Sequence, residues 1–198
     1  MSSVEYRIAR VDDAAEIAEI YEPYVRDTVI SFETEAPTAA EFAARIDRIG
    51  QQYPWLAASS DGRIIGYAYA CENRSRAAYR WSVDAAIYLD AAAQRKGIGR
   101  ALYERLFALL RAQGYVNAFA GITLPNDASI GLHEAVGFTL TGLYRNIGYK
   151  FGAWYDVGWW QLVMTEGWPD QPEEPARFGD LDRAFVTRVL AGAGGTVG

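Results

Sequence analysis

Two glycines and three basic side chains occur together in the segment Gln94-Arg95-Lys96-Gly97-Ile98-Gly99-Arg100. The segment follows an apolar run that ends at Leu89 and opens an amphipathic stretch that continues to Gln113. Glycines let a backbone approach a ligand closely, and the first turn of a helix presents unpaired N–H groups and the positive end of its dipole. The segment predicts a site for an anion such as a diphosphate. A glycine-containing helix start with solvated charges is the alternative.

The two common nucleotide-binding loops do not fit this segment. Lys96 precedes Gly97, whereas the lysine of a P-loop follows the last glycine and is itself followed by Ser or Thr. A dinucleotide-binding fingerprint needs a third glycine and a later acidic residue in a βαβ unit. The predicted anion site is therefore of another kind.

Three arginines, Arg74, Arg76 and Arg80, cluster in the polar segment before the apolar run Ser82–Leu89. The chain as a whole carries a net charge of −6, so this group of cations stands out. Arginine binds carboxylate and phosphinate groups through two parallel hydrogen bonds. The cluster indicates recognition of such an anion, and a solvated surface loop is the alternative.

Hydrophobic periodicity predicts the elements that must position these loops. Alternating or apolar runs predict strands over Val4–Ala9, Trp55–Ser59, Arg63–Ala70, Ser82–Leu89 and Tyr115–Ile122. Caps and helical spacing predict helices from Asp12 or Asp13, from Thr38 to Ile49, over Gly97–Gln113 and from Pro125 to Val136. Two last strands, Phe138–Tyr144 and Val157–Met164, are expected around an aromatic loop. This order is typical of an α+β fold with a central mixed sheet.

The spacing Gln94-x-x-Gly97-x-Gly99, placed between a strand and an amphipathic helix, resembles the acetyl-CoA loop of the GNAT superfamily of N-acetyltransferases. Further segments resemble its phosphinothricin (L-methionine sulfoximine) acetyltransferase branch. These are 31–35 (SFETE), 53–56 (YPWL), 124–127 (LPND), 132–138 (LHEAVGF) and 148–158 (GYKFGAWYDVG). The similarity runs from about Tyr6 to Met164 and does not cover the C-terminal segment.

The resemblance implies a GNAT fold: a central mixed, mainly antiparallel sheet, splayed between strands 4 and 5 and flanked by helices. The pantetheine of acetyl-CoA would lie in the gap and bond to backbone groups of Ile87, Tyr88 and Leu89. The Gln94–Arg100 segment would hold the diphosphate. Asn126 and Ser129, at the start of the next helix, would meet the far side of the cofactor.

The resemblance also implies two catalytic residues. Asp84 falls where the branch has a catalytic Glu, and its side chain is shorter by one methylene, so a bridging water could complete its reach. His133 matches the active-site histidine of the branch and could accept a proton or orient the water. The alternative for Asp84 is an acid at a strand end that bonds nearby backbone, and the alternative for His133 is a structural role. Tyr88 is a possible acid for the departing thiol, and packing is its alternative role.

The substrate pocket implied by the resemblance is lined by Phe32, Ala77, Ala78 and Tyr79, with the three arginines beside them. We therefore expect direct transfer, through a ternary complex, to the amine of a small amino acid or analogue such as phosphinothricin or methionine sulfoximine. Detoxification and a housekeeping role both fit. Members of the branch are homodimers with the region Tyr144–Trp160 near the second site, so a homodimer is expected; this aromatic region could also be core.

Composition limits the other possibilities. The acidic balance argues against a nucleic-acid partner. One histidine and one cysteine, Cys71, cannot form an ordinary zinc site, and no metal is expected. No apolar leader or long apolar run occurs, which predicts a cytoplasmic protein without membrane contact. We expect a domain at residues 1–166 and a partly disordered tail at 167–198.

Two functional alternatives remain open from the sequence. A non-catalytic acyl-CoA-binding or sensor domain would keep the anion-binding segment and lack the base, and the Asp at position 84 makes this worth testing. A GNAT enzyme that modifies a protein or another amine would need an open peptide groove, which the arginine cluster disfavours. A purely structural protein has no need of the Gln94–Arg100 segment.

Overall fold

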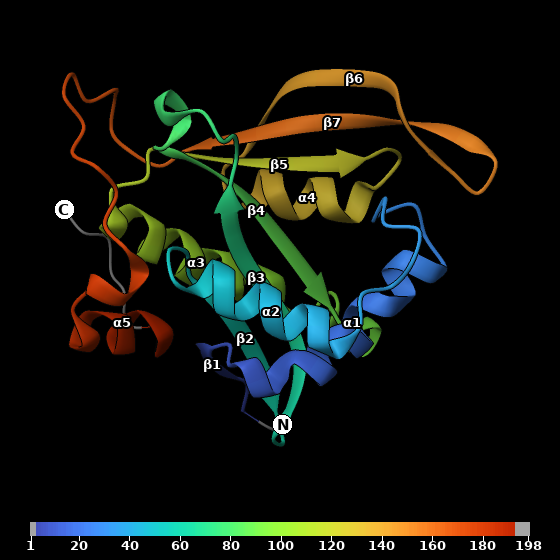
Figure 1. Ribbon diagram of the computed structural model, residues 1–198, viewed down its shortest axis with the longest axis horizontal. Helices are drawn as coiled ribbons and strands as arrows, with labels where there is room; N and C mark the ends of the chain where they lie inside the picture. The colour runs from blue at the N-terminus through green and yellow to red at the C-terminus, as the bar shows by residue number, and fades with distance from the viewer. Residues whose placement is uncertain (1–2, 193–198) are drawn as a thin grey trace.

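The computed structural model describes residues 3–192, and within them one seven-stranded sheet has the order β1-β2-β3-β4-β5-β7-β6 (Figure 1). The strands are β1 (Glu5–Ile8), β2 (Trp55–Ser60), β3 (Arg63–Glu72), β4 (Ser82–Leu89), β5 (Asn117–Thr123), β6 (Thr139–Lys150) and β7 (Ala153–Val163). Strands β4 and β5 pair in parallel, and the other neighbours pair antiparallel. The predicted α+β class with a mixed, mainly antiparallel sheet is confirmed.

The parallel pair β4–β5 separates partway along its length. Its register runs from Ser82 opposite Asn117 to Asp84 opposite Phe119 and ends there. Beyond that point β4 stays paired with β3 as far as Leu89, and β5 stays paired with β7 as far as Thr123. The facing edges of the two strands therefore carry backbone groups without a partner strand, which is the predicted splay.

Helices cover both faces of the sheet. One face carries α1 (Ala14–Arg26) and α2 (Ala39–Gly50), which pack through Ile17 and Phe42 on a core that includes Trp55 and Tyr67. The other face carries α3 (Ile98–Gln113) and α4 (Asp127–Ala135), and α3 buries an apolar stripe against β2–β5. Figure 1 shows α1 and α2 in front of the sheet. The predicted capping box at Thr38 and Glu41 starts α2.

The expected aromatic loop between the last two strands is instead a long hairpin, so that prediction is wrong. Strand β6 extends to Lys150 and β7 begins at Ala153. Phe151 and Gly152 form the turn, with φ angles of 50° and 78°, and positive φ at both central residues suits the twist of a two-residue hairpin. The aromatic residues expected in a loop therefore lie on paired strands that project beyond the rest of the sheet (Figure 1).

The described part of the C-terminal segment packs on the domain. Helix α5 (Arg183–Leu190) buries Val189 in the core beneath α3. Gln113 donates through Nε2 to the carbonyl of Ala176 at 2.8 Å, and Trp81 donates through Nε1 to the carbonyl of Glu173 at 2.7 Å. The partly disordered tail was predicted for residues 167–198, of which 193–198 lie outside the described residues, and that prediction stays open together with the domain boundary at 166. None of the helices between residues 3 and 192 is long and apolar enough to cross a membrane.

Candidate active site

A small cavity of about 70 Å³ occupies the gap between β4 and β5. It is lined by both separated strands, by α4 and by one residue each from α3 and the loop after α1. The lining residues are Ile30, Ala85, Ala86, Ile87, Tyr88, Tyr103, Ala120, Gly121, Ile122, Thr123, Asn126, Ser129 and His133. The structure thus brings together five residues predicted from sequence: Ile87, Tyr88, Asn126, Ser129 and His133.

The end of β4 is fixed by a tyrosine that the sequence interpretation did not include. The hydroxyl of Tyr24 donates to the carbonyl of Leu89 at 2.6 Å and accepts from its N–H at 3.4 Å. It also accepts from Nε2 of Gln94 at 3.1 Å. Because every second residue of a strand presents its backbone groups to the same side, Ile87 faces the gap as Leu89 does. Ile87 keeps free backbone groups there, whereas those of Leu89 are already bonded to Tyr24.

The ring of Tyr88 packs away from the gap. It makes edge contacts with Tyr21 and Tyr24, with ring centroids 4.7 and 5.1 Å apart, and a tilted contact with Tyr67 at 5.5 Å. Burial raises the pKa of its hydroxyl well above the ordinary value. The side chain is therefore part of the aromatic core under α1, which supports the packing alternative over a role as acid.

The start of α3 forms an open cradle for an anion. Gly97 has a φ of 80°, a conformation that other residues adopt at a cost, and it precedes a first turn that no described side chain caps. The first intrahelical bond runs from the N–H of Ala101 to Gly97, so the three N–H groups before it point outward. A Cβ at Gly99 would lie 3.1 Å from Leu132, so glycine keeps α3 close to α4.

The three cations of this segment are not equivalent. Arg95 and Lys96 are exposed at the loop that leads into α3. Arg100 lies one turn further and pairs with Glu104 at 2.7 Å. Two cations rather than three are therefore left to face an anion at the helix start.

Asp84 occupies the last position at which β4 and β5 are paired. Its Oδ1 accepts a 2.6 Å hydrogen bond from Nδ2 of Asn73. Burial raises the pKa of its carboxyl to about 6, against the lowering effect of that bond and of the Arg74 charge. A carboxylate that titrates this close to neutrality is suited to accept a proton.

His133 is buried, with 4% of its surface exposed, and both ring nitrogens are engaged. Nδ1 lies 2.7 Å from the carbonyl oxygen of Ser129, and since a carbonyl only accepts, Nδ1 carries the proton. Nε2 then accepts from the hydroxyl of Tyr103 at 2.9 Å. Burial lowers the pKa of His133 and keeps the ring neutral. Because Tyr103 also lines the cavity, a proton would reach Nε2 through its hydroxyl.

Asp84 and His133 lie on opposite sides of the sheet. The neighbours of Asp84 in the strand, Val83 and Ala85, pack in the core under α3, so the Asp84 side chain points to the face that carries α1 and α2. His133 contacts Tyr103 of α3 on the other face. The two side chains approach the gap from different sides, which suits separate roles.

The arginine cluster divides into two parts. The guanidinium of Arg74 lies over the ring of Tyr79, 5.9 Å from its centroid, and its charge acts on Asp84. Arg80 instead forms an ion pair with Glu174 of the C-terminal segment and donates to the carbonyl of Ala77 at 2.9 Å. Arg74 therefore acts on Asp84, whereas Arg80 is engaged by Glu174, and recognition of one ligand by all three arginines stays a prediction.

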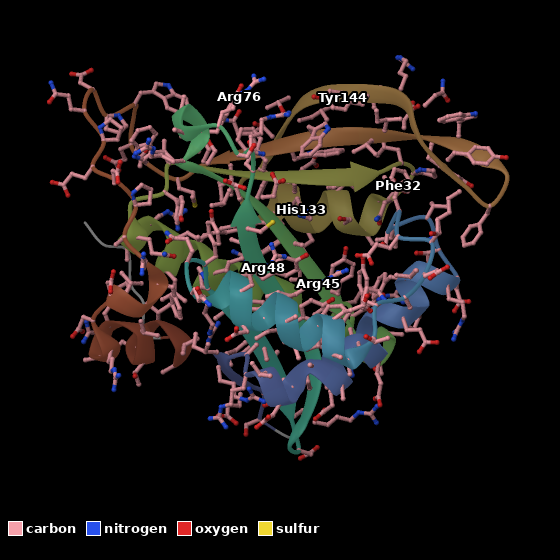
Figure 2. All side chains as sticks on the ribbon, in the orientation of Figure 1. Phe32, Arg45, Arg48, Arg76, His133 and Tyr144 are labelled. Atoms are coloured by element: carbon pink, nitrogen blue, oxygen red, sulfur yellow. The ribbon has the colours of Figure 1, made fainter. Side chains whose placement is uncertain are left out.

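The remaining predicted substrate residues are not among those that line the cavity between β4 and β5. Ala77 and Ala78 lie in a single 3-10 turn, η2 (Ala77–Tyr79), and are exposed, as is Arg76. Figure 2 shows Arg45 and Arg48 on α2, with Arg76 and Tyr144 on the side of the β6–β7 hairpin and Phe32 beneath its outer end. The Arg48 charge acts on Cys71, whose pKa burial raises to about 11, and Cys71 pairs with Asp84 across β3 and β4.

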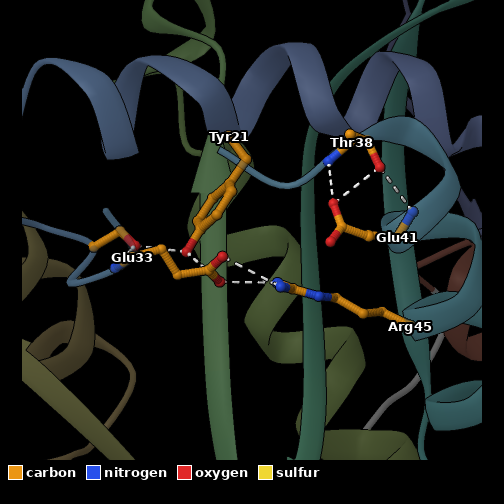
Figure 3. Close-up of polar contacts among 6 residues, drawn as sticks. Tyr21, Glu33, Thr38, Glu41 and Arg45 are labelled. Carbon is orange, nitrogen blue, oxygen red and sulfur yellow. Dashed lines mark hydrogen bonds and ion pairs between the residues drawn. The ribbon is translucent and has the colours of Figure 1, made fainter. Parts of the chain in front are cut away.

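The loop that carries Phe32 is held on its inner side by α1 and α2 (Figure 3). The Tyr21 hydroxyl lies 2.7 Å from Oγ of Ser31 and donates to Glu33 at 3.2 Å. Arg45 binds the Glu33 carboxylate through both terminal nitrogens, at 2.9 and 3.2 Å. Phe32 itself stays 37% exposed.

Sequence reasoning missed Tyr24, Tyr103 and Arg48. Tyr24 and Tyr103 sit at apolar positions of their helices, where the pattern indicates packing, and their hydroxyl partners are 65 and 30 residues away in the chain. Arg48 follows Arg45 by three residues, so both lie on one helix face. This spacing can be seen in the sequence and could have pointed to Arg48. Across residues 3–192 no cluster of three His, Cys, Asp or Glu side chains could hold a metal ion.

Comparisons with known proteins agree with this geometry. The family described as "Acetyltransferase (GNAT) domain" matches residues 6–159. A phosphinothricin N-acetyltransferase of Streptomyces viridochromogenes is 40% identical over 172 residues, which cover 87% of this chain and 94% of that protein. An L-methionine sulfoximine/L-methionine sulfone acetyltransferase of Salmonella typhimurium is 36% identical, covering 81% and 94%.

A solved structure has a fold similar to that of this chain. The GNAT superfamily phosphinothricin acetyltransferase of Sinorhizobium meliloti, in complex with AcCoA, superimposes with a TM-score of 0.82 at 39% identity. The match covers 88% of this chain and 95% of that one. The fold described above is therefore shared with a protein solved in complex with AcCoA.

Proposed function

This chain belongs to the GNAT acetyltransferase family, and on that premise we propose that it transfers the acetyl group of acetyl-CoA to the amine of a small amino-acid analogue. The resemblance seen in the sequence is confirmed at the level of the family. The relatives named as phosphinothricin and methionine sulfoximine acetyltransferases make those two compounds the first substrates to test.

One observation carries the proposal: the uncapped start of α3 lies beside the separated end of β4, where a Cβ at Gly99 would be 3.4 Å from Ile87 and 3.3 Å from Leu89. A pantetheine arm needs unpaired backbone groups along an apolar slot, and Ile87 and its neighbours supply them. A diphosphate needs N–H donors and cations at a helix start. The first turn of α3 after Gly97 provides the N–H groups, and Arg95 and Lys96 provide the cations. Acetyl-CoA brings the activated acetyl group that the amine attacks.

The proposed reaction is a direct transfer in a ternary complex. The amine loses a proton to Asp84, directly or through a water, and its nitrogen bonds to the thioester carbonyl carbon as the carbon–sulfur bond breaks. A backbone N–H at Ile87 polarises the carbonyl oxygen. The sulfur departs as a thiolate and takes its proton from solvent, while His133 and Tyr103 approach from the other face. Asn126 and Ser129 contact the cofactor beside them.

Substrate recognition is proposed at the mouth of the gap on the α1–α2 side. Arg74 and Arg76 supply positive charge for a carboxylate or phosphinate, while Tyr79, Ala77, Ala78 and Phe32 form the walls. Arg48 of α2 adds a cation whose charge acts on Cys71, the residue that pairs with Asp84 across β3 and β4. Detoxification of a natural amino-acid analogue fits this chemistry.

We further propose a cytoplasmic homodimer. The β6–β7 hairpin exposes large apolar side chains along its length: Leu140, Leu143, Tyr144, Ile147, Tyr149, Phe151 and Trp154. So many exposed large apolar side chains on one hairpin are typical of an interface.

Release of free thiol from acetyl-CoA tests the proposal. L-phosphinothricin and L-methionine sulfoximine are assayed first, followed by other amino acids, polyamines and a peptide with a free N-terminus. Fast thiol release with the first two supports the amino-acid analogue. Release with the peptide alone points to a protein-modifying enzyme, and tight acetyl-CoA binding without release with any amine points to a sensor.

A further inference from the structure

Lys150, the last residue of β6, is a buried lysine bonded to the loop after α1. It is 5% exposed, and its ammonium donates to the carbonyl of Val25 at 2.5 Å and to the carbonyl of Ser31 at 2.8 Å. It also lies 4.9 Å from the ring centroid of Phe151. Within the described chain no carboxylate pairs with it. Its bonding partners are thus backbone groups of one segment.

The two carbonyls explain why a cation suits this position. Val25 is in the last turn of α1, where carbonyl groups lack helical partners and the helix dipole favours positive charge. Ser31 precedes Phe32 in the irregular segment that follows. One ammonium therefore joins the end of α1 to the residue next to Phe32.

Gly148 makes a second contact between the hairpin and this segment. A Cβ at Gly148 would overlap the Phe32 ring, so the ring lies directly against the backbone of β6. Position 148 therefore requires glycine because a side chain would not fit beside the Phe32 ring, and not because of a turn. Phe32 is confined by the hairpin from outside, while Tyr21 and Arg45 hold its neighbours Ser31 and Glu33 from inside (Figure 3).

We propose that Lys150 and Gly148 are positioning residues through which the β6–β7 hairpin fixes Phe32 and thereby sets the amine specificity of the site. The inference rests on the proposed function, because it takes Phe32 as a wall of the amine pocket. The hairpin then has two uses: its outer apolar side chains face a partner subunit, and its tip holds the substrate loop of its own chain.

The test compares Lys150→Met, which keeps the length and loses the donors, with Lys150→Arg, which keeps donors. Hydrogen exchange of the amides at residues 28–33 is measured without substrates, and the KM values for amine and for acetyl-CoA are measured separately. Lys150→Met is expected to speed exchange in that segment and to raise the amine KM about tenfold, with the acetyl-CoA KM changed by less than about twofold. Lys150→Arg should recover part of both effects.

Gly148→Ala tests the second contact without removing a charge. The added methyl group displaces the Phe32 ring, so we expect a change in the ratio of kcat/KM between a long-chain amine and a short one. Gly142→Ala is the matched control, because a Cβ there meets open space on the same strand. Arg145→Met is the control for loss of a cation, since that side chain is 78% exposed.

Unchanged exchange and unchanged amine KM in folded Lys150→Met would overturn the proposal, as would an equal rise in both KM values. Each variant is compared with the parent at the same oligomeric state, checked by size-exclusion chromatography. If the parent acetylates no amine, the proposed function fails, yet the exchange experiment still decides whether Lys150 holds the loop. If Lys150→Met does not fold, a Gly148→Ala enzyme with unchanged specificity overturns the inference.

Discussion

Asp84 combines two properties that a proton acceptor at this site needs. The last β4–β5 pair holds its backbone, so the carboxylate has a fixed place at the point where the gap opens. Burial raises its pKa to about 6, which makes it a stronger base than an ordinary aspartate while leaving it ionised at neutral pH. The aspartate side chain is shorter than glutamate by one methylene, and a water that bridges the carboxylate and the amine can span that distance.

We predict that kcat/KM for the amine falls as the pH drops through about 6, because Asp84 must be ionised to accept a proton. Asp84→Asn keeps the shape and the bond from Asn73, and it should lower kcat about 10²- to 10⁴-fold and remove this acidic limb. The measurement is a pH–rate profile of both proteins at saturating acetyl-CoA. If the pH–rate profile of Asp84→Asn keeps the same acidic limb, that limb belongs to the ionisation of another group.

His133 and Tyr103 are expected to act as a unit. Since Nε2 of His133 is reached through the Tyr103 hydroxyl, Tyr103→Phe and His133→Ala should each lower kcat by about 10- to 100-fold. The double variant should be no slower than the slower single one, because residues that act together are not additive. If the two losses in kcat multiply in the double variant, or if Tyr103→Phe leaves kcat unchanged, His133 acts without Tyr103.

At the scale of elements, the separation of two strands and the start of one helix create the site. Neither needs a special side chain: the register of β4 with β5 simply ends while each strand keeps its other neighbour. The helix contributes free N–H groups, and Gly97 and Gly99 keep its first turn accessible and close to α4. Cations then add to a site that the backbone already provides.

We predict that Lys96→Ala weakens acetyl-CoA binding about three- to tenfold and reduces its dependence on salt, since an exposed charge interacts through solvent that salt screens. Isothermal titration at two ionic strengths measures both effects. Arg100→Ala is the control within the same segment, because Glu104 already neutralises Arg100. A larger loss in Arg100→Ala than in Lys96→Ala would contradict the assignment of Lys96 to the diphosphate.

Local signals in the sequence were enough to predict most elements. The limits of β4 matched because its apolar run is bounded by polar residues, and α2 matched because Thr38 and Glu41 form a capping box. The β6–β7 hairpin was missed, since aromatic residues on an exposed two-stranded ribbon do not alternate with polar ones. The ion pair of Arg80 with Glu174 was not predicted, because the two residues lie 94 positions apart in the chain.

At the scale of the molecule, the hairpin and the C-terminal segment extend the domain in opposite directions (Figure 1). The hairpin exposes several large apolar side chains, whereas α5 of the C-terminal segment packs Val189, Phe185 and Leu190 against the core. The hairpin therefore offers more exposed apolar surface to a second copy of the chain than α5 does. This difference makes the hairpin the expected dimer interface.

We predict that Trp154→Glu converts the dimer to a monomer, because Trp154 is 61% exposed at the hairpin and a buried unpaired charge is costly at an interface. Multi-angle light scattering after size exclusion gives the mass directly. Trp168→Glu, at an equally exposed tryptophan of the C-terminal segment, should leave the mass unchanged. A monomeric parent protein would remove the proposed assembly altogether.

Mass spectrometry of the amine after incubation with acetyl-CoA is the most direct test of the central claim. The enzyme should convert L-phosphinothricin or L-methionine sulfoximine to a product heavier by one acetyl group, with one free thiol released per product. Asp84→Asn should bind acetyl-CoA as the parent does and form that product far more slowly. Parent enzyme that binds acetyl-CoA and leaves every amino-acid analogue unmodified would contradict the account.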